Sequence, residues 1–130
     1  MKKYITGIDE VGRGPLAGPV TVCAVRIEWE MYKKLQKNKD LPALGRDSKK
    51  LSKKEREKYS QVLCDLAQKG KLQFTIVMQS NVIIDTKGLS FAIKKALFGC
   101  LQKTEATEKD TVLLDLSSCV LEDRHAFSYR

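Results

Sequence analysis

The sequence has few of the residues that mark zinc-binding, disulfide-linked or membrane proteins. It contains one histidine, and its four cysteines show no C-x-x-C spacing. Three of them, Cys23, Cys64 and Cys100, lie in apolar stretches and are expected to be buried thiols. No apolar run approaches the length of a membrane span, and the one that follows Met1 is too short for a signal-peptide core. We therefore expect a cytoplasmic protein that contacts no membrane.

Two common phosphate-binding loops are also absent. The Gly-Lys-Ser/Thr end of a Walker loop is missing. Residues 12–17 satisfy the pattern G-x-G-x-x-G/A, but a dinucleotide site needs a helix to begin at that loop, and the β-branched run 19–25 follows instead. Two carboxylates directly before the loop would also repel a pyrophosphate unless a metal neutralised them. A nucleotide cofactor is therefore not expected.

The charge is strongly positive and unevenly distributed. Lys and Arg number 24 against 16 Asp and Glu, which gives a formal charge of +8. Residues 1–60 hold 15 of the basic and 8 of the acidic residues, so nearly all of the excess lies in the first half. Such an excess favours a polyanionic partner such as nucleic acid, although a basic surface that merely keeps the protein soluble remains the alternative.

Apolar periodicity predicts an α/β protein of one domain with the element order ββαβαβ. Four strands are expected, over residues 4–8, 20–27, 72–78 and 111–115. Two helices are expected, one from a capping box at Ser52 and Glu55 to a stop at Gly70, and one over residues 89–101. Residues 29–44 are expected to form an irregular connection with a helical turn at 31–35.

The candidate chemistry begins at two adjacent carboxylates. Asp9 and Glu10 directly follow the strand predicted over residues 4–8, and a glycine-rich turn with Arg13 comes next. Strand ends are the usual place for functional residues in α/β sheets, paired acids hold cations, and an arginine suits a phosphate. The alternative is that the acids simply end a strand and the glycines form a loop. The pattern favours a metal-dependent phosphodiester site.

Four motifs, in this order along the chain, resemble the type 2 ribonucleases H, and most closely the bacterial ribonuclease HII family. They are residues 7–20, 47–52, 84–97 and 112–115. The resemblance implies a ribonuclease H-like α/β fold with a mixed central sheet flanked by helices, incomplete at the C-terminus. Residues 1–115 would be the N-terminal part of the catalytic domain, and residues 116–130 an atypical tail.

The resemblance also implies an activity and a set of metal ligands. The family hydrolyses the RNA strand of RNA–DNA hybrids and cleaves at ribonucleotides embedded in duplex DNA, with two Mn²⁺ or Mg²⁺ ions. Asp9 and Asp115 would be metal ligands, and Glu10 a ligand or a partner for the water. If strands 4–8 and 111–115 are parallel neighbours, their ends bring Asp115 towards the acidic pair. No protein partner is implied.

Substrate contacts are implied at two places. Gly12, Arg13 and Gly14 would recognise the 2′-hydroxyl and the adjacent phosphate of the ribonucleotide. Ser48 and Lys49, just before the Ser52 cap, would contact the nucleic-acid backbone, since a helix N-terminus favours a phosphate. For the other lysines of this block, a solvated helix start is the simpler interpretation.

The sequence departs from the family after Asp115. The family continues there with a glycine, a strand, a fourth metal-binding aspartate that opens a helix, and a helical part that carries a substrate-stacking tyrosine. Here Leu116 takes the place of the glycine, and Glu122 and Asp123 are poor substitutes for the missing ligand. The alternative function is therefore a catalytically impaired or inactive truncated remnant that at most binds hybrid nucleic acid.

Overall fold

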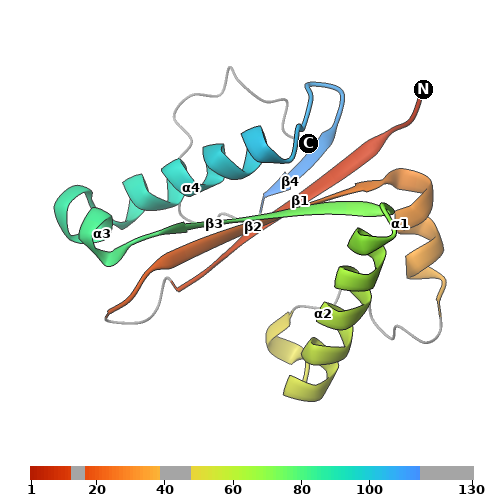
Figure 1. Ribbon diagram of the computed structural model, residues 1–130, viewed down its shortest axis with the longest axis horizontal. Coiled ribbons are helices and arrows are strands. Elements are labelled where there is room, and N and C mark those ends of the chain that lie inside the picture. Colours follow the sequence, from red (N-terminus) through yellow and green to blue (C-terminus); the bar gives the residue numbers. More distant parts are fainter. Residues whose placement is uncertain (13–16, 39–47, 115–130) are drawn as a thin grey trace.

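A four-stranded mixed sheet forms the centre of the computed structural model, which describes residues 1–12, 17–38 and 48–114 (Figure 1). The elements are β1 (Tyr4–Val11), β2 (Val20–Glu28), α1 (Trp29–Gln36), a 3₁₀ turn (Ser48–Lys50), α2 (Lys53–Gln68), β3 (Leu72–Gln79), α3 (Asn81–Lys87), α4 (Leu89–Lys103) and β4 (Thr111–Leu114). The strand order is β3-β2-β1-β4, with β4 parallel to β1 and the other pairs antiparallel. The predicted mixed sheet and the parallel pairing are confirmed.

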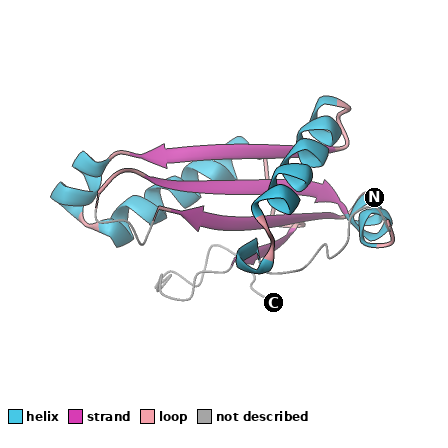
Figure 2. Ribbon diagram, turned by 90° about the horizontal axis from the view of Figure 1, so that it is seen from below, coloured by secondary structure: helices cyan, strands magenta, loops and turns pink. Residues whose placement is uncertain are grey.

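Helix α4 covers one face of the sheet. Its buried residues recur at helical spacing, and the small Ala92 and Ala96 let the helix approach the strands closely. The stripe packs on Ile8, Val22 and Val112 from three neighbouring strands. Helices α1 and α2 lie on the opposite face, near one end of the sheet (Figures 1 and 2). The result is a helix-sheet-helix arrangement in which one face is covered more fully than the other.

The second face divides into two parts, which we call the covered half and the open half. In the covered half, Ile5, Ile27 and Leu72 are buried against Leu35 of α1 and the apolar side of α2. In the open half the same face of β3 continues as Phe74, Ile76 and Met78, which are 43%, 55% and 61% exposed. These three residues pair with β2 through Val25, Cys23 and Thr21. The apolar face therefore extends beyond the helices that cover it.

A buried ion pair fixes the start of β4 to β2. Arg26 Nε lies 2.6 Å from Asp110 Oδ2, Thr107 donates to the same carboxylate, and the guanidinium lies 3.9 Å from the centre of the Tyr4 ring. Burial alone would raise the pKa of Asp110, but the hydrogen bonds from Arg26 and Thr107 and the guanidinium charge outweigh it and lower the pKa. The pair holds β4 in register beside β1.

Three expectations from the sequence are corrected here. Residues 29–36 form a regular helix rather than a single helical turn, because its apolar side packs in the covered half. A helix over Asn81–Lys87 was not predicted; Gly88, with a φ of 88° that favours glycine, separates it from α4. Cys64 is exposed, not buried, because it lies on the solvent side of α2.

The capping box at Ser52 is confirmed. The Glu55 amide donates to Ser52 Oγ at 3.2 Å, and the Ser52 amide donates to Glu55 Oε2 at 2.7 Å. Across the described part of the chain, none of the helices has both the length and the apolar content needed to cross a lipid bilayer.

Candidate functional site

Asp9 and Glu10 lie inside β1, not after its end. The strand continues past its predicted end at residue 8 because β2 still pairs with it there, as far as Val11↔Thr21. Asp9 pairs with Cys23, and Glu10 pairs with Val22. The predicted strand of residues 4–8 covers Tyr4 and the four residues of β1, 5–8, that pair with both β2 and β4. The two acids therefore occupy the last part of β1, where its backbone is held by β2 alone among the described strands.

Strand geometry sends the two acidic side chains to opposite faces of the sheet. Asp9 is exposed on the face of the open half, whereas Glu10 is half-buried on the α4 face, where its Oε2 atom is buried. The Glu10 amide donates to Asp9 Oδ1 at 2.8 Å, which fixes the Asp9 carboxylate close to the backbone. The carboxylates thus flank one strand instead of sharing one surface.

Strand β4 leads directly to the third predicted ligand. Its pairing with β1 runs from Ile5↔Thr111 to Ile8↔Leu114. The next residue of β1 is Asp9, and the next residue of the chain after Leu114 is Asp115, which lies outside the described residues. Within the ranges that the structure describes, no three Asp, Glu, Cys or His side chains come together as a metal-binding group. The role of Asp115 therefore stays a prediction.

Gly12 has a clear structural requirement. Its φ is +92°, and a Cβ atom at this position would lie 2.4 Å from the carbonyl oxygen of Pro19. Only glycine fits, because the chain must turn there between β1 and β2. Arg13 and Gly14 lie outside the described residues, so the substrate role predicted for this loop stays a prediction.

Ser48 and Lys49 lie in the 3₁₀ turn before α2 and are exposed. The Leu51 amide donates to the Ser48 carbonyl at 3.2 Å, which closes the turn. The capping box occupies the amides of Ser52 and Glu55, so fewer helix-terminal donors remain for a phosphate than the sequence suggested. Contact with the nucleic-acid backbone at these two residues stays a prediction.

A shallow depression of about 480 Å³ adjoins Asp9 on the open half. Gly7, Cys23 and Leu113 line it with Asp9, so its floor is apolar and its rim carries a carboxylate. Burial raises the pKa of the Cys23 thiol, with smaller contributions from Cys100 and Asp9. The sequence analysis missed Cys23 as a neighbour of Asp9, because that pairing depends on the register between β1 and β2.

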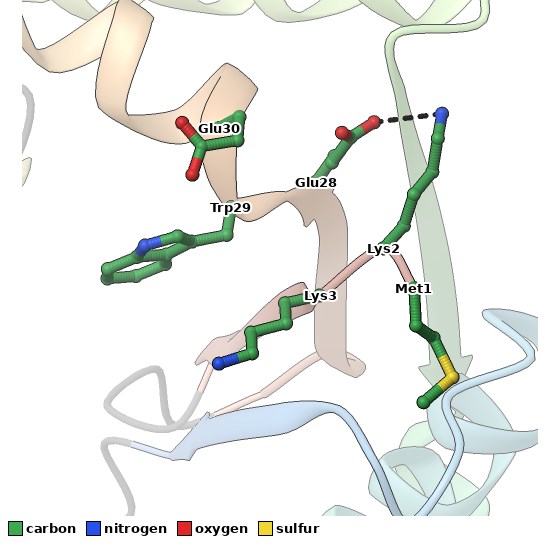
Figure 3. Close-up of a pocket in the computed structure, with 6 residues that line it drawn as sticks. All are labelled: Met1, Lys2, Lys3, Glu28, Trp29 and Glu30. Carbon is green, nitrogen blue, oxygen red and sulfur yellow. Dashed lines mark ion pairs between the residues drawn. The ribbon is translucent and has the colours of Figure 1, made fainter.

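A second hollow lies at the other end of β1 (Figure 3). It is bounded by residues 1–3 and 28–30, and Lys2 Nζ forms an ion pair with Glu28 Oε2 at 3.1 Å. No residue of this hollow was singled out in the sequence. Because it adjoins the opposite end of the strand from Asp9, it is not part of the candidate site.

Comparison with known proteins identifies a family. The family model described as Ribonuclease HII matches residues 6–126, which extends past the last motif recognised in the sequence. The ribonuclease HII of Clostridium beijerinckii is 41% identical over 93 residues, which are 72% of this chain and 31% of that protein. The ribonuclease HII of Shouchella clausii is 39% identical over 117 residues, which are 86% of this chain and 40% of that protein. The chain thus spans well under half the length of these relatives.

A solved structure supports the fold independently. The crystal structure of ribonuclease H2 from Pyrococcus horikoshii OT3 superposes with a TM-score of 0.64 at 24% identity, over 84% of this chain and 49% of that chain. About half of that larger protein therefore has no counterpart in these 130 residues.

Proposed function

Because this chain belongs to the ribonuclease HII family, we propose that it carries the sheet and the first metal ligands of an endonuclease. Its substrates would be the RNA strand of RNA–DNA hybrids and ribonucleotides embedded in duplex DNA. The observation that carries the proposal is the β1–β4 register: the last described pair, Ile8↔Leu114, immediately precedes Asp9 on one strand and Asp115 on the chain that leaves the other.

Chain connectivity supports a shared carboxylate site. Leu114 pairs with Ile8, consecutive Cα atoms are about 3.8 Å apart and paired strands about 4.8 Å apart, which supports our proposal that the carboxylates of Asp9 and Asp115 act at one site. Two carboxylates at one site would repel each other unless a cation offset their charge. We propose that Asp9 and Asp115 are direct ligands and that Glu10, on the other face, is a ligand or holds the attacking water.

The side chains at the Asp9 end of the sheet suit hard divalent cations. Carboxylate oxygens are the donors that Mg²⁺ and Mn²⁺ prefer, and the described neighbourhood of Asp9 holds no histidine that would select a softer metal. A crystal structure of Bst-RNase HIII in complex with Mn²⁺, 16% identical with a TM-score of 0.59, is among the similar folds. When bound, the cations would lower the pKa of the nucleophilic water and offset charge on the leaving 3′-oxygen.

Recognition of the substrate would rest on the loop after β1. Gly12 has a positive φ and approaches the Pro19 carbonyl, and Arg13 and Gly14 are the next two residues of the sequence. We propose that this loop contacts the 2′-hydroxyl and the adjacent phosphate, which distinguish RNA from DNA. Ser48 and Lys49 would add a contact to the backbone, and the net charge of +8 would favour the polyanion.

A second candidate function is hybrid binding with little or no cleavage. It is favoured by the open half of the sheet beside Asp9 and by the short span of the chain, 31% of the Clostridium beijerinckii relative. Cleavage needs a site in which every ligand of both cations is fixed. Binding needs only a basic surface that attracts the phosphates of the nucleic acid. For this reason we expect slow turnover from the 130 residues alone.

The test is cleavage of a DNA duplex with a single ribonucleotide, in Mn²⁺ or Mg²⁺, with binding followed in parallel. Asp9→Asn should reduce the cleavage rate by about 100-fold or more, since it removes a metal ligand. Asp65→Asn is the matched control, because Asp65 is an exposed acid of α2 whose carboxylate accepts a hydrogen bond from Gln61. Binding without cleavage in the wild type would favour the second candidate, and cleavage that survives Asp9→Asn would overturn the first.

A further inference from the structure

The hollow at the start of β1 combines an aromatic ring with a lysine (Figure 3). Trp29, the first residue of α1, is 40% exposed and lines this hollow together with Lys3. The Trp29 amide donates to the Lys3 carbonyl at 2.9 Å, so the two residues are neighbours through their backbones. Figure 3 shows both side chains extending in the same direction. The volume of about 570 Å³ lies within the usual range for small-molecule sites, about 300–1,000 Å³.

The Trp29 ring is held by a neighbour on its own helix. Tyr32 stacks on it, with 5.7 Å between the ring centres and an angle of 30° between the ring planes. The Gln36 side chain donates to the Tyr32 hydroxyl at 3.0 Å, so three residues along one side of α1 are linked. A ring held in this way loses little conformational freedom when a ligand stacks on it.

The charges around the hollow are unevenly compensated. Glu28 Oε2 lies 3.1 Å from Lys2 Nζ. Glu30 Oε1 lies 2.7 Å from Lys33 Nζ. Both carboxylates at the hollow thus have a lysine partner, whereas Lys3 forms no ion pair within the described ranges of the chain. The positive charge that remains at the hollow is therefore that of Lys3, which favours an anionic ligand.

A ligand that uses both features is flat, aromatic and anionic. Every nucleobase has a π-face that stacks on an aromatic side chain, and its phosphate attracts a lysine. The N–H groups of a base would also find an acceptor in the Glu30 carboxylate, which has about four lone-pair positions. An aliphatic anion would leave Trp29 without a partner, and an uncharged aromatic ligand would leave Lys3 without one. The chemistry of the hollow thus favours a base joined to a phosphate.

We propose that the Trp29–Lys3 hollow binds a nucleobase together with its phosphate, supplied by a single-stranded nucleic acid or by a free nucleotide. A duplex suits the hollow less well, because its bases already stack on one another. Asp9 lies roughly 20 Å from Lys3 along β1, so this contact is separate from the candidate metal site. The inference goes beyond the proposed cleavage and does not depend on it.

The experiment uses the fluorescence of Trp29, the one tryptophan in the sequence. The full chain is titrated in EDTA, at one salt concentration, with a short strand of deoxythymidine and separately with a strand of equal length that lacks bases. The deoxythymidine strand should quench the emission, because a base stacks on the indole. The abasic strand carries the same phosphates but should bind about fivefold or more weakly and leave the emission unchanged.

Substitutions separate this site from general attraction to a basic protein. Lys3→Ala should weaken binding of the deoxythymidine strand by about threefold or more. Lys95→Ala is the matched control, because Lys95 is exposed on α4, which covers the other face of the sheet, and its loss changes the net charge equally. It should change the affinity less than about twofold. With a labelled strand, Trp29→Ala should weaken binding by about fivefold or more, and Trp29→Phe, which keeps a ring, by less.

Three outcomes would each overturn the proposal: no quenching by the strand or by deoxythymidine monophosphate, equal binding of the abasic strand, or equal weakening by Lys3→Ala and Lys95→Ala. The comparison of the two strands uses the wild-type chain, so it decides the matter even if a variant does not fold. Quenching by the monophosphate as strong as that by the strand would support the site and identify a free nucleotide as its ligand.

The same titration is independent of the proposed function, because EDTA removes the cations that cleavage requires. Quenching in a chain that never cleaves would leave this inference intact and count against the proposed cleavage. Cleavage by a chain whose Trp29 emission no strand or nucleotide quenches would support the proposed function and overturn this inference.

Discussion

The covered and open halves of one sheet face differ in burial although they share strands. Leu72 and Ile76 lie on the same side of β3, four residues apart, and are 5% and 55% exposed. The covered half has its own helices, α1 and α2, while the open half contains Asp9 and the depression beside it. On this face of the sheet, the half that packs best is therefore the one distant from Asp9.

The largest expected effect is on stability in the covered half. Leu72→Ala should lower the free energy of unfolding by about 2–5 kcal/mol, because it leaves a cavity between β3 and the helices. Ile76→Ala should cost less than about 1 kcal/mol, since that side chain is already more than half exposed. Urea unfolding measures both. Equal losses would mean that the two halves are covered alike.

The Arg26–Asp110 ion pair joins β2 to the start of β4 on the face of the sheet that α4 covers. Asp110→Asn should cost about 2–3 kcal/mol, somewhat below the range for fully buried pairs because Arg26 is 14% exposed in its side chain. Since the pKa of Asp110 is lowered in the folded state, its contribution is present above the ordinary aspartate pKa of about 3.9. This contribution to stability is lost as the pH falls through the lower pKa that Asp110 has in the folded state.

The pH dependence of the free energy of unfolding provides a control for the Arg26–Asp110 prediction. Below about pH 4, the wild type should lose stability more steeply than Asp110→Asn, which no longer carries the group that titrates. Asp65→Asn, an exposed acid of α2, should follow the wild-type curve. Parallel acid unfolding of wild type and Asp110→Asn would contradict a stabilising ion pair.

The smallest expected effect is the loss of a helix cap, and it can be compared between the first residues of α2 and of α3. Ser52→Ala should destabilise the protein by about 1 kcal/mol, because it breaks the capping box of α2 in the covered half. Ser80, the N-cap of α3, makes no side-chain cap hydrogen bond, so Ser80→Ala should have almost no effect. Thermal unfolding of the two variants separates them, and a larger loss for Ser80→Ala would be inconsistent with the capping seen here.

Much of the fold was predictable because local rules determined it. The capping box at Ser52, the stripe of α4 and the alternation of β3 each require only nearby residues. The extension of β1 past Ile8 was missed because it depends on pairing with β2, which a strand pattern does not reveal. Sequence alternation places Leu72 and Phe74 on the same side of a strand and does not indicate which of them a helix covers.

The candidate site was predictable in part for the same reason. Asp9, Glu10 and the parallel β1–β4 pairing followed from strand patterns and the family resemblance, and the pairing is confirmed. That the two acids point to opposite faces follows from their position within a strand, and it was hidden by the expectation that the strand ends at residue 8. The proximity of Cys23 depends on register, which no local pattern specifies.

The most direct test of a metal site at the Asp9 end is a titration with paramagnetic Mn²⁺ followed by amide NMR. Signals of Asp9, Cys23 and Leu114 should broaden first. Those of Lys3, roughly 20 Å from Asp9 along β1, and of Leu72, roughly 16 Å from Asp9 across two strands, should broaden only at higher Mn²⁺. Asp9→Asn should abolish the selective broadening. Uniform broadening, or broadening that begins at the covered end and survives Asp9→Asn, would contradict the proposal that the open half holds the catalytic cations.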